Sequence, residues 1–396
     1  MPHGLPVIDL DPFDDDLLSD PYPFYDALRA AGPVVWLSRW NICAVARHAE
    51  MHTVLNNSDT FISGRGVGVC DYGRVAPPRP PILILESDAP LHSRLRTVYN
   101  RTLSAVAVRT LRAHFTEVAE ALVDRLLAKR HIDAVTELAQ AYPLSVFPDA
   151  LGIAKTGRER LLPLADLAFN THGPDNARRA ASIAELSTHY PYMRDACQRE
   201  NLSPDGFGAK IFEHVDAGDI TLDEADGLMR ALLTAGMDTT VHALGAAVEL
   251  LASNPDQWDM LRADPSRARN TFDETVRHAS PLQTFARTTD TPTTLGGHAI
   301  GAGQKIMMFL ASANRDPEKW ADPDRFDITR RTGGHVGFGL GPHMCAGQLV
   351  ARLEGEVLLE TLARKVARIE ITAPPKRHLN SVLRGWADLP VTLTAA

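Results

Sequence analysis

The sequence has few cysteines, no strong excess of one charge and no dense basic block. Its four cysteines are far apart and form no C-x-x-C pair, so neither a zinc site nor a redox dithiol is indicated. They are typical of free thiols in a reducing compartment. The formal net charge of -8 and the pI of about 6.0 argue against a nucleic-acid-binding protein.

A signal peptide and a membrane-spanning run are also missing. The N-terminus is acidic and lacks the positive and apolar regions of a signal peptide. The most apolar later stretch, Val241 to Ala252, contains His242 and Glu249 and is too short to span a bilayer. We therefore expect a soluble, cytoplasmic protein that binds neither a membrane nor nucleic acid.

The chain shows no linker, repeat or low-complexity tract, which predicts one domain over residues 1–396 with a short N-terminal extension of about 1–19. The expected fold is mainly α with a minor β portion. Periodicity and capping residues predict helices over 21–31, 91–102, 105–128, 157–170, 222–253, 268–279 and 347–366. Short strands are expected over 34–37, 42–45 and 304–310 and around 295–298, and the Pro-rich segment 77–81 is expected to be an irregular loop.

The most informative motif is Phe338-Gly-Leu-Gly-Pro-His-Met-Cys345-Ala-Gly347. A Gly-rich loop here leads into the N-terminus of a helix, where the free N–H groups and the helix dipole favour a thiolate. Glycines let a flat cofactor approach the backbone. A lone cysteine is more often a small buried apolar residue, but Phe338, the glycines and the following helix favour a ligand.

This loop resembles the haem-binding signature of the cytochrome P-450 family. The resemblance implies a single-domain P-450 fold, with haem b (iron protoporphyrin IX) between the long oxygen-binding helix and the helix after the Cys loop. Cys345 would be the axial ligand of the haem iron. Glu274-Thr-Val-Arg277 resembles the family's structural E-x-x-R pair, and Arg325 is expected to complete that triad.

In the longest helix, Ala235-Gly236-Met-Asp238-Thr239-Thr resembles the family's oxygen-binding groove. Ala235 and Gly236 would make room for dioxygen, and Asp238 and Thr239 would be the acid–alcohol pair that relays protons. The resemblance also implies basic partners for the haem carboxylates, namely His92, Arg96, Arg287 and His343.

Over nearly the whole chain, the sequence is most similar to the bacterial subfamily that oxidises para-substituted benzoates such as 4-methoxybenzoate by O-demethylation or hydroxylation. The residues that correspond to that subfamily's substrate pocket are Arg79, Leu85, Phe169, Arg230, Ala235 and Phe285.

The pocket also departs from the subfamily. Ile82 and Ala231 replace two serines that donate hydrogen bonds to the carboxylate, and His172 replaces a phenylalanine. A buried carboxylate without donors costs several kcal/mol. Oxidation of a neutral aromatic ether or methoxyphenol therefore stays open as an alternative.

The sequence contains no flavin or nicotinamide fingerprint, because Gly64-Arg-Gly-Val-Gly68 lacks the strand–helix context of such a motif. Electrons would then come from an iron–sulfur ferredoxin and its NAD(P)H-dependent reductase. A haem-based ligand sensor or carrier is an alternative of another class, which would not need Asp238 and Thr239.

Overall fold

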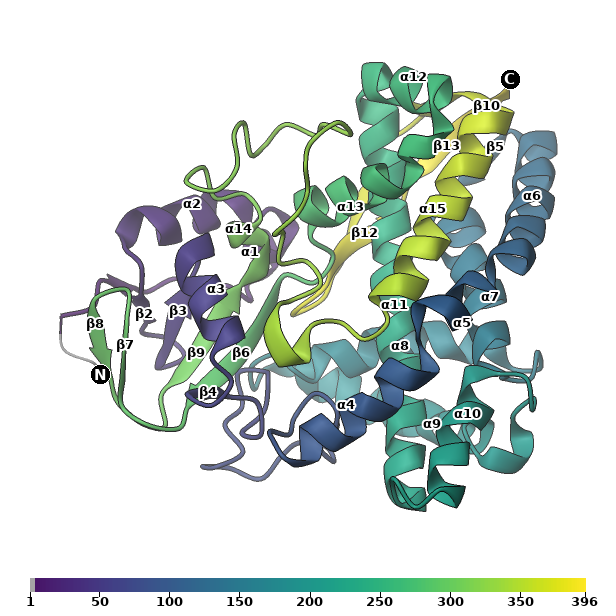
Figure 1. Cartoon of the computed structure of the whole chain (residues 1–396). Coiled ribbons are helices and arrows are strands. Elements are labelled where there is room, and N and C mark those ends of the chain that lie inside the picture. Colours follow the sequence, from purple (N-terminus) through teal and green to yellow (C-terminus); the bar gives the residue numbers. More distant parts are fainter. Residues whose placement is uncertain (1–3) are drawn as a thin grey trace.

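The computed structural model describes residues 4–396, and residues 1–3 of the expected N-terminal extension lie outside the described residues. The described chain forms a β-rich part, which contains β1 to β4 and β6 to β9, and a larger helical part (Figure 1). The N-terminus lies at the β-rich side and the C-terminus at the far end of the helical part (Figure 1).

Most of the chain is helical. The helices are α1 (Asp15–Ser19), α2 (Tyr22–Ala31), α3 (His48–Asn56), α4 (Leu91–Thr102), α5 (Ala105–Arg109), α6 (Arg112–Lys129), α7 (Ala141–Leu151), α8 (Leu161–Asn170), α9 (Ala177–Ala196), α10 (Phe207–Asp216), α11 (Leu222–Ser253), α12 (Pro255–Ala263), α13 (Ala268–Ala279), α14 (Leu310–Ala313) and α15 (Gln348–Lys365). Shorter helical turns are the π-helical η1 (Val135–Gln140) and the 3₁₀ turns η2 (Arg158–Arg160), η3 (Arg199–Asn201), η4 (Pro265–Arg267) and η5 (Gly341–His343).

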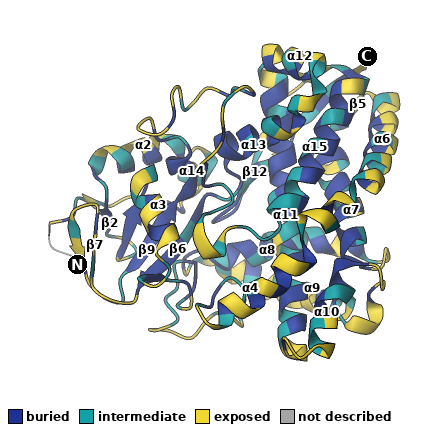
Figure 2. Ribbon diagram, in the orientation of Figure 1, coloured by how far each residue is buried: buried dark blue, intermediate teal, exposed yellow. Residues whose placement is uncertain are grey.

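Helix α11 passes through the middle of the helical part (Figure 1). It begins at a capping box, in which the Thr221 side chain accepts from the amide of Glu224 and the Glu224 side chain accepts from the amide of Thr221. Its last two turns before Asn254 are largely buried against neighbouring elements, as the dark blue colour along α11 shows (Figure 2). A 32-residue helix with apolar residues on most sides is expected in the core of a large domain.

The strands form one larger sheet and three small ones. They are β1 (Val7–Ile8), β2 (Val35–Leu37), β3 (Ile42–Val45), β4 (Phe61–Ile62), β5 (His131–Asp133), β6 (Thr284–Thr289), β7 (Thr293–Leu295), β8 (His298–Ile300), β9 (Lys305–Phe309), β10 (Val366–Ile371), β11 (Lys376–Leu379), β12 (Arg384–Asp388) and β13 (Pro390–Ala395). The six-stranded sheet has the order β1-β2-β3-β9-β6-β4, and the smaller sheets are β10-β13-β5, β11-β12 and β7-β8. Strands β6 and β9 pair antiparallel, which places Phe285 opposite Met308.

The predicted mainly α fold with a minor β portion is confirmed. Helices α4, α11 and α13 coincide with their predicted ranges, and β2 and β3 pair antiparallel as a hairpin. The single helix predicted over 105–128 is wrong, because α5 ends at Arg109 and α6 begins at Arg112. At this break the hydroxyl of Thr110 donates to the carbonyl of Ala107, a local bond that competes with helix continuation.

Helix α9 lies outside the predicted ranges for a physical reason. Only Ser182 and Met193 of its 20 residues are buried, so it carries no apolar stripe that periodicity could reveal. Within residues 4–396, no helix is both long enough and apolar enough to cross a membrane.

Candidate active site

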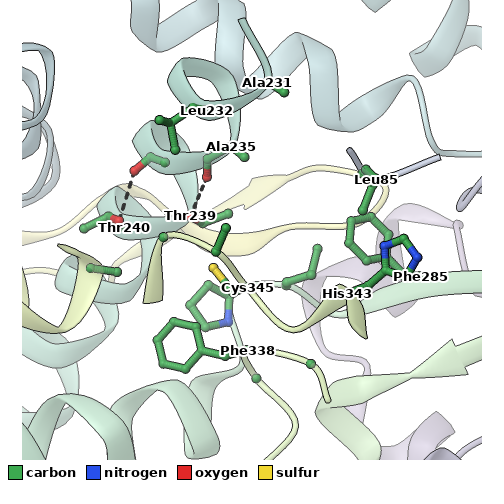
Figure 3. A pocket seen from close by; sticks show the side chains of 18 of the residues that line it. Leu85, Ala231, Leu232, Ala235, Thr239, Thr240, Phe285, Phe338, His343 and Cys345 are labelled. Atoms are coloured by element: carbon green, nitrogen blue, oxygen red, sulfur yellow. Dashed lines mark hydrogen bonds between the residues drawn. The ribbon is translucent and has the colours of Figure 1, made fainter. Parts of the chain in front are cut away.

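A cavity of about 250 Å³ lies between α11, the loop before α15, and the strands β6 and β9. Figure 3 shows it from close by: Ala231, Ala235 and Thr239 on α11 face one side, and the sulfur of Cys345 points into it from the other. Leu85 and Phe285 form part of its wall (Figure 3). The two sequence motifs, more than a hundred residues apart, therefore meet at one cavity.

Cys345 sits at the end of a loop whose fold is fixed by glycine and by one main-chain bond. Its amide donates to the carbonyl of Phe338 at 2.8 Å, and Gly339 and Gly341 have positive φ angles of 68° and 67°. Burial raises the pKa of the Cys345 thiol, whereas the amides of Gly347 and Gln348 at the start of α15 oppose that rise. The sulfur of this half-buried cysteine thus faces amide donors at a helix N-terminus, as a thiolate ligand needs.

Thr239 and Asp238 lie on different sides of α11. Thr239 lines the cavity, and its hydroxyl donates to the carbonyl of Ala235 at 2.9 Å (Figure 3). Asp238 does not line the cavity among the residues described; its side chain is 8% exposed, and its carboxylate lies 3.4 Å from Nε2 of His242. Consecutive helix residues project about 100° apart, so the predicted pair is adjacent in sequence but divided between the cavity and the interior behind it.

Gly236 also lines the cavity, but its missing side chain serves packing. A Cβ atom at this position would lie 2.3 Å from Cζ of Phe147 on α7. The ring of Phe147 therefore occupies the place of a side chain at Gly236. Gly236 and Ala235 both line the cavity, and Ala235 faces it (Figure 3), so their predicted role in making room for dioxygen stays a prediction.

Four basic residues gather beside the cavity and form no ion pair with an acidic side chain of residues 4–396, although the charge of Asp88 acts on His92 and Arg287. The rings of His92 and His343 lie 3.8 Å apart, and Nε2 of His92 and Nδ1 of His343 have no hydrogen-bond partner within residues 4–396. Burial, followed by the charge of Arg287, lowers the pKa of His343 to about 3.

Arg287 is itself 5% exposed, donates to the carbonyl of Ala286, and has its pKa lowered by burial to about 10. Arg96 lines the cavity and donates to the carbonyl of Met344.

This arrangement fits the expected haem. A buried guanidinium and orphaned imidazole nitrogens are costly unless an anion pairs with them, and haem b carries two carboxylates. The thiol of Cys345 and these basic groups border the same cavity, except that His92 lies one layer behind His343.

The E-x-x-R pair forms a fully buried ion pair, but its third member differs from the prediction. Arg277 donates to both oxygens of Glu274, at 2.7 and 2.8 Å, and both side chains are 0% exposed. The second guanidinium on Glu274 belongs to Arg330, with Nε at 3.2 Å, and not to Arg325. Arg325 contributes only its main-chain carbonyl, which accepts from Arg277 and Arg330, so its predicted side-chain role is wrong.

Arg79, the expected carboxylate ligand, lies behind the cavity wall. Its guanidinium donates to both oxygens of Glu86, at 2.8 and 3.2 Å, and the Glu86 side chain is 0% exposed. Burial raises the pKa of Glu86, but the charges of His172 and Arg79 outweigh this and bring it to about 2. A nitrogen of Arg79 also lies 3.3 Å from the ring of His172, which lines the cavity.

The cavity wall near His172 is apolar. Ile82, Leu85, Phe169, Ala231 and Phe285 line it, as predicted for the substrate pocket. Arg230 does not line it; Cys197 and Asp226 lie near that side chain. The structure therefore brings together the apolar and aromatic pocket residues but leaves both predicted arginines outside the cavity.

Two residues that the sequence did not single out lie at this site. Arg330 could not be found from a motif because it follows the E-x-x-R pair by more than fifty positions. His242 has a detectable signal, since it follows Asp238 by four positions and so lies on the same helix face.

Comparisons with known proteins agree with this geometry. The family model described as cytochrome P-450 matches residues 198–376. CYP199A2, a cytochrome P-450 of Rhodopseudomonas palustris, is 55% identical over 99% of this chain and 96% of its own. Beta-dihydromenaquinone-9 omega-hydroxylase of Mycobacterium tuberculosis is 30% identical over 98% of this chain and 79% of its own. The solved structure of CYP109Q5 from Chondromyces apiculatus superposes with a TM-score of 0.82 at 29% identity, covering 98% of this chain and 99% of its own.

Proposed function

The chain belongs to the cytochrome P-450 family of haem-dependent monooxygenases, and from that premise we propose that it oxidises a methoxy or alkyl group on a para-substituted benzoate such as 4-methoxybenzoate. The observation that carries this proposal is an aromatic-lined cavity that opens onto Thr239 and Cys345, with the Arg79 guanidinium 3.3 Å from His172 in its wall. The sequence similarity to the benzoate-oxidising subfamily supports the same substrate class.

The residues proposed to hold the haem are Cys345 as the axial ligand and Arg96, Arg287, His343 and His92 as partners of its carboxylates. When bound through a thiolate, haem supplies the activation of dioxygen for insertion of one oxygen atom into a C–H bond. Phe338 covers the loop around Cys345, where the guanidinium of Arg352 lies 4.4 Å from its ring centre. The amides of Gly347, the N-cap of α15, and of Gln348 donate toward the sulfur.

Thr239 and Asp238 are proposed to supply protons to the reacting oxygen. Thr239 lines the cavity, and its hydroxyl can both accept and donate a hydrogen bond. In its present bond it donates to Ala235, so it can release that carbonyl and turn toward the cavity. Asp238, one residue earlier, would return a proton to it from the buried side of α11.

The charge around His172 favours an acidic substrate. Burial and the charges of Arg79 and Lys305 lower the pKa of His172 to about 3, and only Glu86 opposes them. The Arg79 guanidinium lies 3.3 Å from the His172 ring, so a carboxylate bound against His172 would lie near a positive charge. A neutral His172 still has one N–H that can donate to such a carboxylate. The para substituent would then point toward Thr239 and Ala235.

A neutral aromatic ether is the second candidate, and a specific observation favours it. Arg79 is already bonded by both oxygens of Glu86, and Ile82 and Ala231 offer no side-chain donor. A methoxyphenol would meet this wall without the desolvation cost of a charge.

Electrons are proposed to come from an iron–sulfur ferredoxin and its NAD(P)H-dependent reductase. The turn η5 before Cys345 is on the surface, and Met344 is 36% exposed. A small redox protein that docks there would approach the haem from the Cys345 side.

An optical titration of the ferric holoenzyme separates the two candidates. We expect 4-methoxybenzoate to shift the haem from low to high spin, and Ile82→Ser or Ala231→Ser to tighten its binding about tenfold, since a hydrogen bond to a charged group contributes roughly 1.5 kcal/mol. Methyl 4-methoxybenzoate and guaiacol are the uncharged controls, whose binding the serines should leave nearly unchanged. A spin shift with the uncharged compounds alone would overturn the benzoate proposal in favour of the ether.

A further inference from the structure

Behind Asp238, on the side of α11 that faces away from the cavity, lies a cluster of ionisable side chains from three elements. His242 follows Asp238 on α11, Asp166 comes from α8, and His378 comes from β11. Ligand atoms of Asp166, His242 and His378 all lie within 4.8 Å of one another.

The inner end of the cluster is buried and incompletely bonded. The side chains of His242 and Asp238 are 6% and 8% exposed. Their facing atoms, Nε2 and Oδ2, are 3.4 Å apart, and neither has a hydrogen-bond partner within residues 4–396. Buried polar atoms are normally paired, so a proton shared between this imidazole and this carboxylate would satisfy both.

The outer end of the cluster reaches the solvent. Nε2 of His378 lies 2.6 Å from Oδ1 of Asp166, which also accepts from Asn380 at 2.7 Å. The side chains of His378 and Asp166 are 29% and 25% exposed. The cluster therefore runs from the protein surface to the acid beside Thr239.

The rings of His242 and His378 are stacked, with centres 5.4 Å apart and planes 23° apart. Glycine makes this possible, because a Cβ atom on Gly385 of β12 would lie 2.0 Å from Nδ1 of His242. A distance of up to 4.8 Å between polar atoms is one that a single water molecule bridges.

We propose that His242, His378 and Asp166 form a proton-entry route that returns protons from solvent to Asp238. The inference rests on the proposed role of Asp238. Protonated His242 gives its Nε2 proton to the Asp238 carboxylate and becomes neutral. It then regains a proton from protonated His378 through a bridging water, and His378 is reprotonated by solvent at its exposed edge.

The overall balance matches a monooxygenase turnover. One dioxygen, two electrons from the redox partner and two protons convert a C–H bond to C–OH and one water, and the route carries those two protons inward. Its residues exchange only protons, so no group in the cluster is oxidised or reduced.

The charges that face His378 favour its protonated form. Burial lowers the pKa of His378, but its hydrogen bond to Asp166 and the charges of Asp166 and Asp238 outweigh this, so the net pKa is raised even though Arg178 of α9 opposes it. Burial raises the pKa of Asp166, but its bond to His378, its bond to Asn380 and the charge of His242 lower it below its usual range. His378 is thus a proton store whose occupancy declines as the pH rises through its elevated pKa.

The first test needs neither substrate nor turnover. The ring nitrogens of His242 and His378 are followed by ¹⁵N NMR against pH in the diamagnetic ferrous–CO holoenzyme. We expect Asp238→Asn and His378→Gln each to shift the titration of His242, whereas His114→Gln should not. His114 is a matched control, because it forms a similar pair with Asp149 at 3.0 Å in another part of the helical region. An identical His242 titration in all four proteins would overturn the route.

The second test measures turnover of His242→Gln and His378→Gln with any substrate that wild type converts. We expect unchanged substrate-induced spin shift and KM. We expect kcat to fall roughly tenfold or more, a modest share of what proton transfer contributes in enzymes, and to fall further as the pH rises. A merely structural role would change KM or the spin shift and would leave the pH profile unaltered, and that result would overturn the route.

The two tests distinguish this inference from the proposed function. If wild type converts neither benzoates nor aromatic ethers, the proposed substrate class is wrong, and the NMR titration still decides whether the cluster is coupled to Asp238. If wild type converts them and both glutamine variants behave like wild type at every pH, the route is wrong and the substrate class stands.

Discussion

Replacing Arg330 or Arg325 by glutamine tests which of these two arginines, five positions apart, completes the ion triad with Glu274 and Arg277. Arg330 bonds the buried carboxylate of Glu274, and its other bonds go to the exposed carbonyls of Ala321, Asp322 and Arg325. Those carbonyls can bind water once the guanidinium is lost, so their contribution is small. The Glu274 bond is different, because that side chain is 0% exposed.

The expected loss of stability depends on the hydrogen bonds that Glu274 still accepts in the variant. In Arg330→Gln it still accepts two bonds from Arg277 and one from the amide of Asp327. The loss is then one charge-assisted hydrogen bond, about 2–3 kcal/mol, rather than the roughly 3–5 kcal/mol of an unpaired buried charge. Arg325→Gln removes an exposed side chain with no side-chain bond among residues 4–396 and should change stability by less than about 0.5 kcal/mol.

The assay is thermal unfolding of the haem-loaded proteins, followed by circular dichroism at one fixed scan rate. An unfolding entropy of about 2.1 cal/mol/K per residue corresponds to about 0.8 kcal/mol/K for this chain, so Arg330→Gln should lower the midpoint by about 2–4 °C. Arg325→Gln carries the same charge change and serves as the control, with a shift below about 1 °C. Equal shifts in the two variants, or a larger shift for Arg325→Gln, would refute the assignment of Arg330 to the triad.

Two further predictions concern the cavity. Thr239→Ala should lower the amount of product formed per NADH consumed without weakening substrate binding, because the hydroxyl bonds only the Ala235 carbonyl and lies apart from the His172 wall. Product and NADH are measured together, and the spin-shift titration measures binding. An unchanged product yield would count against the role of Thr239 in proton supply. His172→Gln should reduce the loss of folding stability that occurs as the pH falls from about 6.5 to 4.5. The pKa of His172 is about 3 in the folded chain, so below its usual value of 6.5 the unfolded chain takes up a proton that the folded chain does not. Stability therefore falls as the pH falls in wild type. Glu86 acts in the same direction only below its usual pKa of 4.5, since its stabilisation is lost as the pH falls toward about 2. Denaturant midpoints against pH check this, and parallel curves for wild type and variant would contradict it.

The sequence alone was sufficient to predict those features that depend on neighbouring residues in the chain. Thr221 and Asn254-Pro255 mark the ends of α11 in the sequence, because capping and proline act within one turn. The Cys345 loop and the Ala235–Thr239 segment were recognisable because each residue's role depends on its immediate neighbours. The apolar residues of the pocket followed from similarity, and the structure places Ile82, Leu85, Phe169, Ala231 and Phe285 on one cavity.

Only the tertiary structure decided which charged groups meet. Arg79 looked like a free cation in a loop, but Glu86 folds back onto it through the turn at residues 82–86. Arg330, rather than Arg325, reaches Glu274, because the chain folds back so that the Arg330 guanidinium also donates to the carbonyls of Ala321 and Asp322. Asp166, His242 and His378 are separated by 76 and 136 positions, and packing of α8, α11 and β11 brings them together. Capping and periodicity act over a few residues and can be read from the chain, whereas ion pairs and proton routes depend on long-range packing that no local pattern records.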